Sequence, residues 1–487
     1  MKVRLFLAGV MVAATVVSGS VHAQSAQASG DCRCEDSFGW LRSTFETNDA
    51  GFGYAVEKKG RAAYDLHNQI TLEKVRTART YSECGELLYE WLTFFRRGHI
   101  GIQRLIRDTS VLQTPEMEMW EGDIAGFEKE IDSRQDAGLE GIWEFGPSKI
   151  GFKAEGGGYI GFFIESDVEG WDPGMVAMRI VRDGYQWQII SYNYTGGVTK
   201  PTVISGKPEL VGNTYMLLQG RQLVKRLSPV FPEEPELESF MKSLQARTPY
   251  IEELNPAMLY MRIPSFDHQH KPAVDKMIAD NRDKLFSVEN LIIDVRGNGG
   301  GSDITYEEIL PFLYTDPVRT PAVSFLSTPL NIEKTLALLD IAELGEELHR
   351  EIAGLADKMK AHPGELVPMG DKEVEIEIRD TVYQSPRNVA IIVDERCGST
   401  TEQFLLAAKQ SKKVKLFGTT TYGSLDASNV RTVDSPDGRY RLLYTTSLSS
   451  RVPGMAIDEI GLQPDFYLDE TVPRYRWVEH VSEILNR

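Results

Sequence analysis

Two strongly apolar segments in the second half of the chain constrain its fold most. "NLIIDV" (290–295) and "NVAIIV" (388–393) have the composition of buried strands, and each is followed by a short corner and a helical pattern. The alternation of strand and helix extends from "MLYMRI" to "KVKLFGTT". This order predicts an α/β domain with a largely parallel sheet.

The rest of the chain divides by its periodicity. Residues 24–103 carry apolar side chains three and four positions apart, which predicts an N-terminal helical domain. Between 104 and 228 the period becomes two and glycines are frequent, which predicts an inserted β-rich domain. We expect the α/β domain to cover 229–487. Its amphipathic segment 330–363 is expected to be a helical insertion: a packed surface helix, a lid, or the arm of a homo-oligomer.

The first 23 residues have the pattern of a signal peptide. A basic start precedes an apolar run and small residues, so we expect cleavage after Ala23. The run is short for a membrane span, and no later stretch is apolar enough to be one. The sequence therefore predicts an exported protein, periplasmic or secreted. Export permits disulfides, and Cys84 could pair with Cys32 or with Cys34.

The charge of the chain bears on its partners. The formal net charge is −18, and the signal peptide contributes only basic residues to it. An acidic surface argues against nucleic acid and against anionic membranes. No cysteine pair or histidine cluster indicates zinc, and "DHQH" (267–270) is expected to be a solvated loop. We therefore expect neither a metal nor a cofactor.

The corners after the two buried strands carry the candidate chemistry. Ser399 lies at the start of the helical pattern "TTEQFLLAAK", where serine serves either as a nucleophile or as a helix cap. "RGNGGGSD" (296–303) can turn backbone N–H groups toward a ligand. A phosphate loop would end in GK[ST], and Asp303 would repel phosphate. A nucleophile facing free amides is typical of a hydrolase.

Three ordered motifs resemble a known family. "LIIDVRGNGGGSD", "VAIIVDERCGSTTEQFLLAAKQSKKVKLFGTTTYG" and "IDEIGLQPDFYL" are similar to the C-terminal processing (tail-specific) proteases and the tricorn catalytic core. The resemblance covers roughly residues 250 to 470, and "RRGHIGI" (96–102) resembles the family element "DGHT". It implies a crotonase-like α/β fold and a serine peptidase that acts on protein or peptide substrates.

The resemblance also implies roles for single residues. Ser399 matches the first serine of the family's "SASE" stretch and would be the nucleophile. Ser424 stands where many members have a lysine base, so the base would be His99, as in the tricorn-like branch. Asp458 would orient the imidazole, with Glu459 as the alternative acid.

Two further expectations complete the hypothesis. The amides of Gly300 and Thr400 would hold the oxyanion. The alternative is a non-catalytic periplasmic binding protein on the same scaffold, in which the missing lysine reflects lost chemistry.

Overall fold

The computed structural model describes residues 32–105, 118–136, 138–183, 186–192, 202–205, 208–218, 222–341 and 345–487. The predicted signal peptide and its cleavage site lie outside the described residues. The chain forms two compact units. The first contains the described residues up to 105 together with 246–472 and 477–487, and the second contains those from 118 to 245 together with 473–476.

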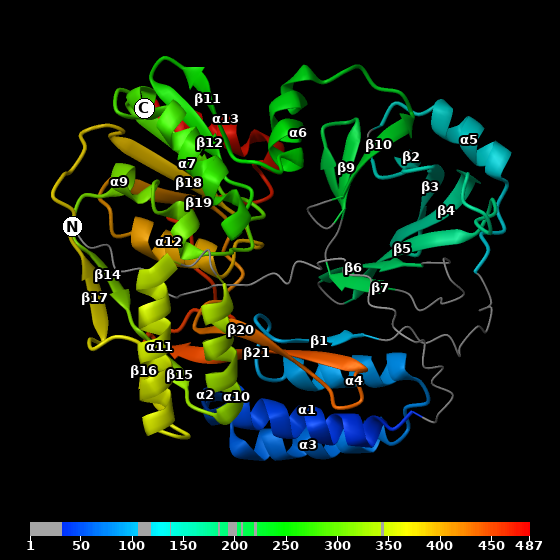
Figure 1. Ribbon diagram of the computed structural model, residues 1–487. Coiled ribbons are helices and arrows are strands. Elements are labelled where there is room, and N and C mark those ends of the chain that lie inside the picture. Colours follow the sequence, from blue (N-terminus) through cyan, green and yellow to red (C-terminus); the bar gives the residue numbers. More distant parts are fainter. Residues whose placement is uncertain are drawn as a thin grey trace. The chain divides into compact units, whose positions relative to one another are not determined.

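The first unit contains the predicted parallel sheet. Its order is β11-β12-β13-β18-β19-β22, and every neighbouring pair from β12 onward is parallel. The strands are β11 Tyr250–Asn255, β12 Met258–Arg262, β13 Asn290–Asp294, β18 Asn388–Val393, β19 Val414–Gly418 and β22 Phe466–Tyr467. The helices between these strands include α7 Lys271–Asp280, α8 Arg282–Leu285, α9 Leu310–Leu313 and α12 Thr400–Ala408, and α13 Trp477–Leu485 follows them (Figure 1). The mixed helix and sheet content expected from the sequence is therefore present.

Both faces of this sheet are covered, which explains its continuous apolar strands. Leu291 and Ile293 of β13 belong to one core together with Phe404 of α12. Ile292 points to the other face and joins a second core with Trp477 of α13. Because successive residues of a strand face opposite sides, neither face of β13 tolerates a polar pattern.

A second sheet of the first unit joins the N-terminal segment to the C-terminal half. Its order is β1-β21-β15-β16, and β20 also pairs with β21. The strands are β1 Gly101–Arg104, β15 Val323–Leu326, β16 Leu366–Pro368, β20 Ala427–Asp434 and β21 Tyr440–Ser449. β1 pairs antiparallel with β21, with Gly101 opposite Leu443. The sequence pattern contains no signal for this pairing, because the two strands lie more than 300 residues apart.

The N-terminal helices share their core with this second sheet. They are α1 Cys34–Asn48, α2 Phe52–Lys59, α3 Arg61–Val75 and α4 Tyr81–Thr93. Phe45 and Trp91 pack in one cluster with Leu442 and Tyr444 of β21. The N-terminal helices belong to the first compact unit.

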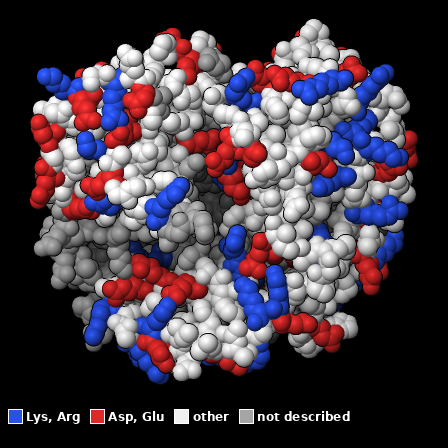
Figure 2. All heavy atoms as spheres, turned by 180° about the vertical axis from the view of Figure 1, so that it is seen from behind, with Lys and Arg blue, Asp and Glu red and all other residues white. Residues whose placement is uncertain are grey.

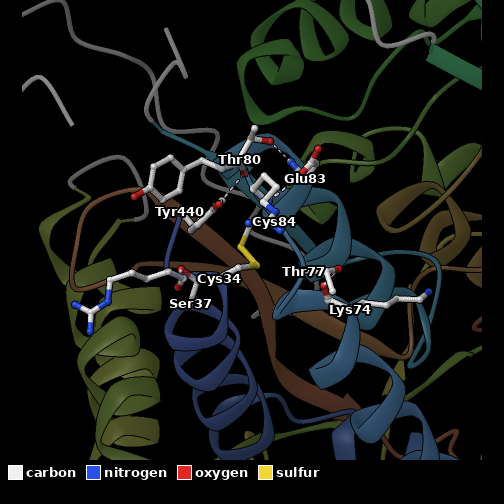
Figure 3. The surroundings of a disulfide bond; sticks show 11 residues. Cys34, Ser37, Lys74, Thr77, Thr80, Glu83, Cys84 and Tyr440 are labelled. Carbon is white, nitrogen blue, oxygen red and sulfur yellow. Dashed lines mark hydrogen bonds between the residues drawn. A yellow bond between two sulfur atoms is a disulfide. The ribbon is translucent and has the colours of Figure 1, made fainter. Parts of the chain in front are cut away.

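A disulfide fastens the first of these helices to the last. Cys34 of α1 bonds to Cys84 of α4, and both residues are buried (Figure 3). Beside it, the Tyr440 hydroxyl of β21 donates to the Tyr81 carbonyl at 2.7 Å. Of the two pairings left open by the sequence, the structure contains the one with Cys34.

The expected helical insertion contains two helices, α10 Pro329–Leu336 and α11 Gly345–Ala361. Leu355 and Met359 of α11 are buried against Phe325 of β15 and Val367 of β16. The insertion therefore has a packed face on the second sheet. Nearby, β14 Val318–Pro321 and β17 Val374–Glu377 form an antiparallel ribbon.

The second unit contains an antiparallel sheet of nine strands in the order β7-β6-β5-β4-β3-β2-β10-β9-β8. Its strands are β2 Gly141–Phe145, β3 Ser148–Glu155, β4 Gly158–Ser166, β5 Val176–Asp183, β6 Gln186–Ser191, β7 Thr202–Ser205, β8 Glu209–Val211, β9 Tyr215–Leu218 and β10 Gln222–Ser228, and its helices are α5 Ile124–Asp132 and α6 Glu238–Gln245. Trp143 and Phe152 are buried within its core.

The surface carries charges of both signs. Figure 2 shows Lys and Arg side chains interspersed with groups of Asp and Glu on the face that it displays. Among the described residues, no helix is long and apolar enough to cross a membrane.

Candidate active site

Ser399 lies at the corner between β18 and α12, as the sequence predicts. It is the residue before the first turn of α12, and its backbone has φ 56° and ψ −126°. A serine in this region is strained by roughly 1–3 kcal/mol, so the surroundings must hold it there. β13 and β18 are parallel neighbours, so the glycine-rich loop after β13 and the Ser399 corner leave the same edge of the sheet. The side chain is buried, and its contact with His99 is described next.

His99 contacts Ser399 directly. His99 lies in the segment before β1, and its Nε2 lies 3.0 Å from Ser399 Oγ at the edge of the parallel sheet. Its Nδ1 lies 2.7 Å from the carbonyl oxygen of Ala427, the first residue of β20. A carbonyl can only accept a hydrogen bond, so Nδ1 carries the proton and donates it. The Nε2 lone pair is therefore the acceptor that faces the Ser399 hydroxyl.

The environment of His99 keeps the imidazole neutral. Burial lowers the pKa of His99 below its usual 6.5, while the Ala427 carbonyl and the charge of Asp458 act in the opposite direction. A neutral imidazole at physiological pH is the form that can accept a proton. The site thus contains a serine hydroxyl and an unprotonated acceptor at hydrogen-bonding distance.

Asp458 fixes the loop whose Ala427 carbonyl accepts the hydrogen bond of His99. Its carboxylate accepts the N–H groups of Leu425 at 2.6 Å, Asp426 at 2.7 Å and Ala427 at 3.0 Å. His99 Nδ1 donates its hydrogen bond to the Ala427 carbonyl and not to Asp458. Asp458 therefore orients His99 indirectly, through the backbone of Ala427. Burial and the charge of Asp426 raise the pKa of Asp458, and the three amide bonds oppose that rise.

Asp426 makes the same type of contact in the opposite direction, with the loop that carries Asp458. Its carboxylate accepts the N–H groups of Ile457 and Asp458, and it pairs with Arg451 at 2.8 Å in a buried ion pair. The two loops therefore cap each other's amides. Asp426 and Arg451 were not expected at the site, because neither lies in one of the motifs that resemble the family.

Glu459, the alternative acid, points elsewhere. Its carboxylate pairs with Lys58 at 3.2 Å and with Lys59 at 3.3 Å, both on α2. Its φ of 68° turns the chain between Asp458 and Ile460. The structure thus brings Asp458, and not Glu459, to the loop beneath His99.

Glu402 ties the Ser399 corner to the neighbouring loop. Its buried carboxylate accepts the N–H groups of Ser399 at 3.2 Å, Gly423 at 2.8 Å and Ser424 at 2.8 Å, and also the Thr421 hydroxyl. Burial raises the pKa of Glu402, and these donors act against that rise.

Ser424, expected from the resemblance to replace a lysine base, lies next to the segment that carries His99. Gly98 packs against it so closely that a Cβ on Gly98 would lie 2.4 Å from Ser424 Oγ. The segment that carries His99 thus packs directly against Ser424.

The glycine-rich loop lies against the Ser399 corner. Gly300 has φ 106°, and a Cβ there would lie 2.8 Å from Ser399 Cβ and 2.9 Å from the Thr400 nitrogen. Only glycine fits this close approach. The Gly300 N–H donates to Asn298 Oδ1 at 3.0 Å, so in this conformation it is not free to bind an oxyanion. The Thr400 N–H belongs to the first turn of α12, whose amides and dipole favour negative charge.

Comparisons with known proteins agree with this architecture. Residues 257–468 match the model of peptidase family S41, a segment that includes Ser399 and Asp458 and leaves out His99. The structure of mature CPAF is 14% identical, covers 93% of this chain and 96% of that chain, and has a TM-score of 0.50. At this identity, the likeness concerns the fold.

Two further solved structures are more distant in shape. The photosystem II D1 C-terminal processing protease is 12% identical over 94% of this chain and 98% of its own, with a TM-score of 0.39. The tricorn protease is 12% identical over 93% of this chain and 36% of its own, also with a TM-score of 0.39. A search among curated proteins gave no match.

Proposed function

Because residues 257–468 carry the peptidase domain of family S41, we propose that the protein is an exported serine endopeptidase with Ser399 as nucleophile and His99 as general base. The observation that carries the proposal is the 3.0 Å contact between Ser399 Oγ and His99 Nε2, with the His99 Nδ1 proton held by the Ala427 carbonyl. This is the geometry that proton transfer from a serine hydroxyl requires.

The proposed reaction has two halves. Ser399 Oγ bonds to the carbonyl carbon of the scissile peptide while its proton moves to His99 Nε2. The resulting imidazolium gives this proton to the leaving amine, and the C–N bond breaks. Water then attacks the acyl carbon and gives a proton to His99 Nε2. The Ser399 Oγ–acyl bond breaks, Oγ takes this proton back from the imidazolium, and the acid is released.

Asp458 acts in this proposal as a positioning residue. It fixes the amides of 425–427, and the Ala427 carbonyl fixes the imidazole. Its charge also stabilises the imidazolium that forms during the reaction, since it favours the protonated form of His99.

For the oxyanion we propose the Thr400 amide together with the glycine-rich loop. The start of α12 supplies the favourable dipole. Participation of the Gly300 amide requires that its N–H leave Asn298 Oδ1 when substrate binds.

The finer architecture belongs to the same proposal. We propose a crotonase-like catalytic core of the tail-specific branch, with the nine-stranded unit as an inserted β-rich domain. The fold likeness to mature CPAF over 93% of this chain supports the peptidase fold in general, and the assignment to this branch rests on the motif resemblance. A homo-oligomer formed through the 330–363 insertion remains a prediction.

Export is supported by chemistry as well as by the N-terminal pattern. The Cys34–Cys84 disulfide is of the kind that persists in oxidising compartments. We propose a periplasmic or secreted location, with protein or peptide substrates and no cofactor.

Proteolysis of an unfolded protein tests the proposal. Wild-type protein and the Ser399→Ala variant are incubated with reduced, unfolded casein, and new termini are identified by mass spectrometry. We expect internal cleavages by the wild type that disappear in Ser399→Ala. A folded wild-type protein that cleaves nothing would favour the non-catalytic binding protein instead.

A further inference from the structure

The first unit contains a pocket behind the catalytic corner. Its volume is about 450 Å³, within the range of natural ligand sites. It lies between the β14–β17 ribbon, the loop after β13 and one face of α12. Gln403 and Ala407 of α12 line it, one and two helical turns after Ser399. A group bound in it would therefore begin within roughly 6 Å, along the helix axis, of the nucleophile.

The lining of this pocket is strongly acidic. Six of its residues carry carboxylates and two carry guanidinium groups. Arg379, one of the two cations, pairs with Glu377. The acids are Asp303, Glu307, Glu308, Glu375, Glu377 and Asp380. The pocket therefore attracts a cation.

Asp303 is the lining residue that a bound cation would contact. It belongs to the short 3-10 helix Asp303–Tyr306 after the glycine-rich loop and is only 7% exposed. Neither of its carboxylate oxygens receives a well-aligned hydrogen bond from a described residue, although the Thr400 and Tyr306 hydroxyls lie close enough to lower its pKa. A buried acceptor without a partner is costly, so one expects a ligand to satisfy it.

Two neighbours of Asp303, Thr400 and Arg451, are engaged elsewhere. The Thr400 hydroxyl donates to the Gly301 carbonyl at 3.0 Å. The Arg451 guanidinium, which acts on Asp303 through its charge, pairs with Asp426 and contacts Gln403. Burial raises the pKa of Asp303 well above its usual range, and the Thr400 and Tyr306 hydroxyls and the charge of Arg451 act against that rise.

An organic cation fits these observations better than a metal ion. Among the described residues, no group of three or more His, Cys, Asp or Glu side chains is arranged to hold a metal. One buried carboxylate among the acidic residues that line the pocket suits an extended side chain that ends in a positive charge.

We propose that this pocket receives a Lys or Arg side chain of the substrate and that the Asp303 carboxylate pairs with its positive charge. The proposal rests on the proposed peptidase function. It makes Asp303 a specificity-determining residue, separate from the Ser399–His99 pair.

The first experiment measures binding without catalysis. Butylguanidinium and its neutral analogue butylurea are titrated by calorimetry into the Ser399→Ala variant. We expect butylguanidinium to bind to Ser399→Ala and butylurea not to bind. The affinity for butylguanidinium should fall at least tenfold in Ser399→Ala/Asp303→Asn. The control Ser399→Ala/Asp357→Asn removes an exposed acid of α11 and should bind as the parent does. Equal binding to the Asp303→Asn form would overturn the proposal.

The second experiment measures selectivity. Two peptides that differ only by Lys or norleucine at the enriched position of the casein cleavage sites are compared. In Asp303→Asn we expect kcat/KM for the lysine peptide to fall on the order of tenfold to a hundredfold, with the norleucine peptide unchanged. Casein sites without enrichment of Lys or Arg, or an equal loss for both peptides, would contradict the proposal. Binding of butylguanidinium with no cleavage of any protein would instead refute only the peptidase function.

A stability measurement guards against misfolding. If Asp303 had a structural role, its replacement would destabilise the protein. A buried carboxylate without a partner destabilises the ligand-free protein, so its replacement would stabilise it. We therefore expect Asp303→Asn to raise the Tm at neutral pH. A lowered Tm together with lost binding would assign Asp303 a structural role.

Discussion

Backbone strain gathers around the proposed nucleophile at the scale of single residues. Four residues other than glycine have positive φ angles in the described part of the chain: His99, Ser399, Asn429 and Glu459. Three of them belong to the site or flank Asp458. Such conformations persist only where contacts hold them, and here Glu402, the Ala427 carbonyl and the lysines of α2 supply those contacts.

The pH dependence of activity follows from the state of His99. The neutral imidazole accepts the proton, so activity is full above the folded pKa and is lost as the pH falls through it. Burial places this pKa below 6.5. We expect kcat/KM, measured from about pH 4 to about pH 8, to have an acid limb with its midpoint below the unperturbed value. A midpoint clearly above neutrality would contradict this environment.

Substitutions of the adjacent acids Asp458 and Glu459 distinguish a positioning role from a surface ion pair. Asn at position 458 would turn an amide donor toward backbone N–H groups, so we expect Asp458→Asn to lower kcat on the order of a hundredfold and the free energy of unfolding by about 1–3 kcal/mol. Glu459→Gln removes only partly exposed ion pairs with Lys58 and Lys59. It should cost less than about 1 kcal/mol and leave kcat nearly unchanged. Steady-state kinetics and urea unfolding of both variants check this, and the reverse order of effects would contradict it.

At the scale of elements, the site is assembled by strand pairing. β1 adds to β21 and brings His99 beside β20, while the parallel pair β13 and β18 aligns the glycine-rich loop with Ser399. The N-terminal helices matter because they fix β1 through the core that they share with β21. Their disulfide is therefore expected to stabilise the geometry of the site indirectly.

Removal of that disulfide should cost stability. Cys34 and Cys84 enclose a loop with a sequence separation of 50 residues. The chain-entropy model gives about 4 kcal/mol for a loop of this length. We expect a Cys34→Ala/Cys84→Ala variant to unfold at clearly lower guanidinium concentration than the wild type. Addition of dithiothreitol should move the wild-type midpoint toward that of the variant and leave the variant unaffected. Identical midpoints for all samples would contradict a structural disulfide.

Local signals made some of these elements predictable and left others hidden. The parallel sheet and the Ser399 corner follow from apolar runs and the residues that end them. His99 was found through a motif resemblance, because its contact with Ser399 spans 300 residues. The Ala427 carbonyl could not be found, since a backbone acceptor has no sequence signature. The commitment of the Gly300 N–H to Asn298 depends on loop geometry that glycine content does not specify.

At the scale of the whole molecule, the chain is expected to reach its compartment with a new N-terminus. Cleavage after Ala23 should leave Gln24 first in the mature protein. Intact-mass measurement of protein from the periplasm or medium, with the oxidised Cys34–Cys84 pair counted, tests export and disulfide together. Protein that retains Met1 in the cell envelope would contradict export by this route.

Active-site labelling tests the central claim most directly. A fluorophosphonate reacts covalently only with a serine whose hydroxyl is activated by a base. The account predicts that the wild-type protein is labelled, that Ser399→Ala is not, and that His99→Ala is labelled on the order of a thousandfold more slowly although it remains folded. Labelling that persists in Ser399→Ala, or rapid labelling of His99→Ala, would contradict the assignment of Ser399 and His99 as nucleophile and base.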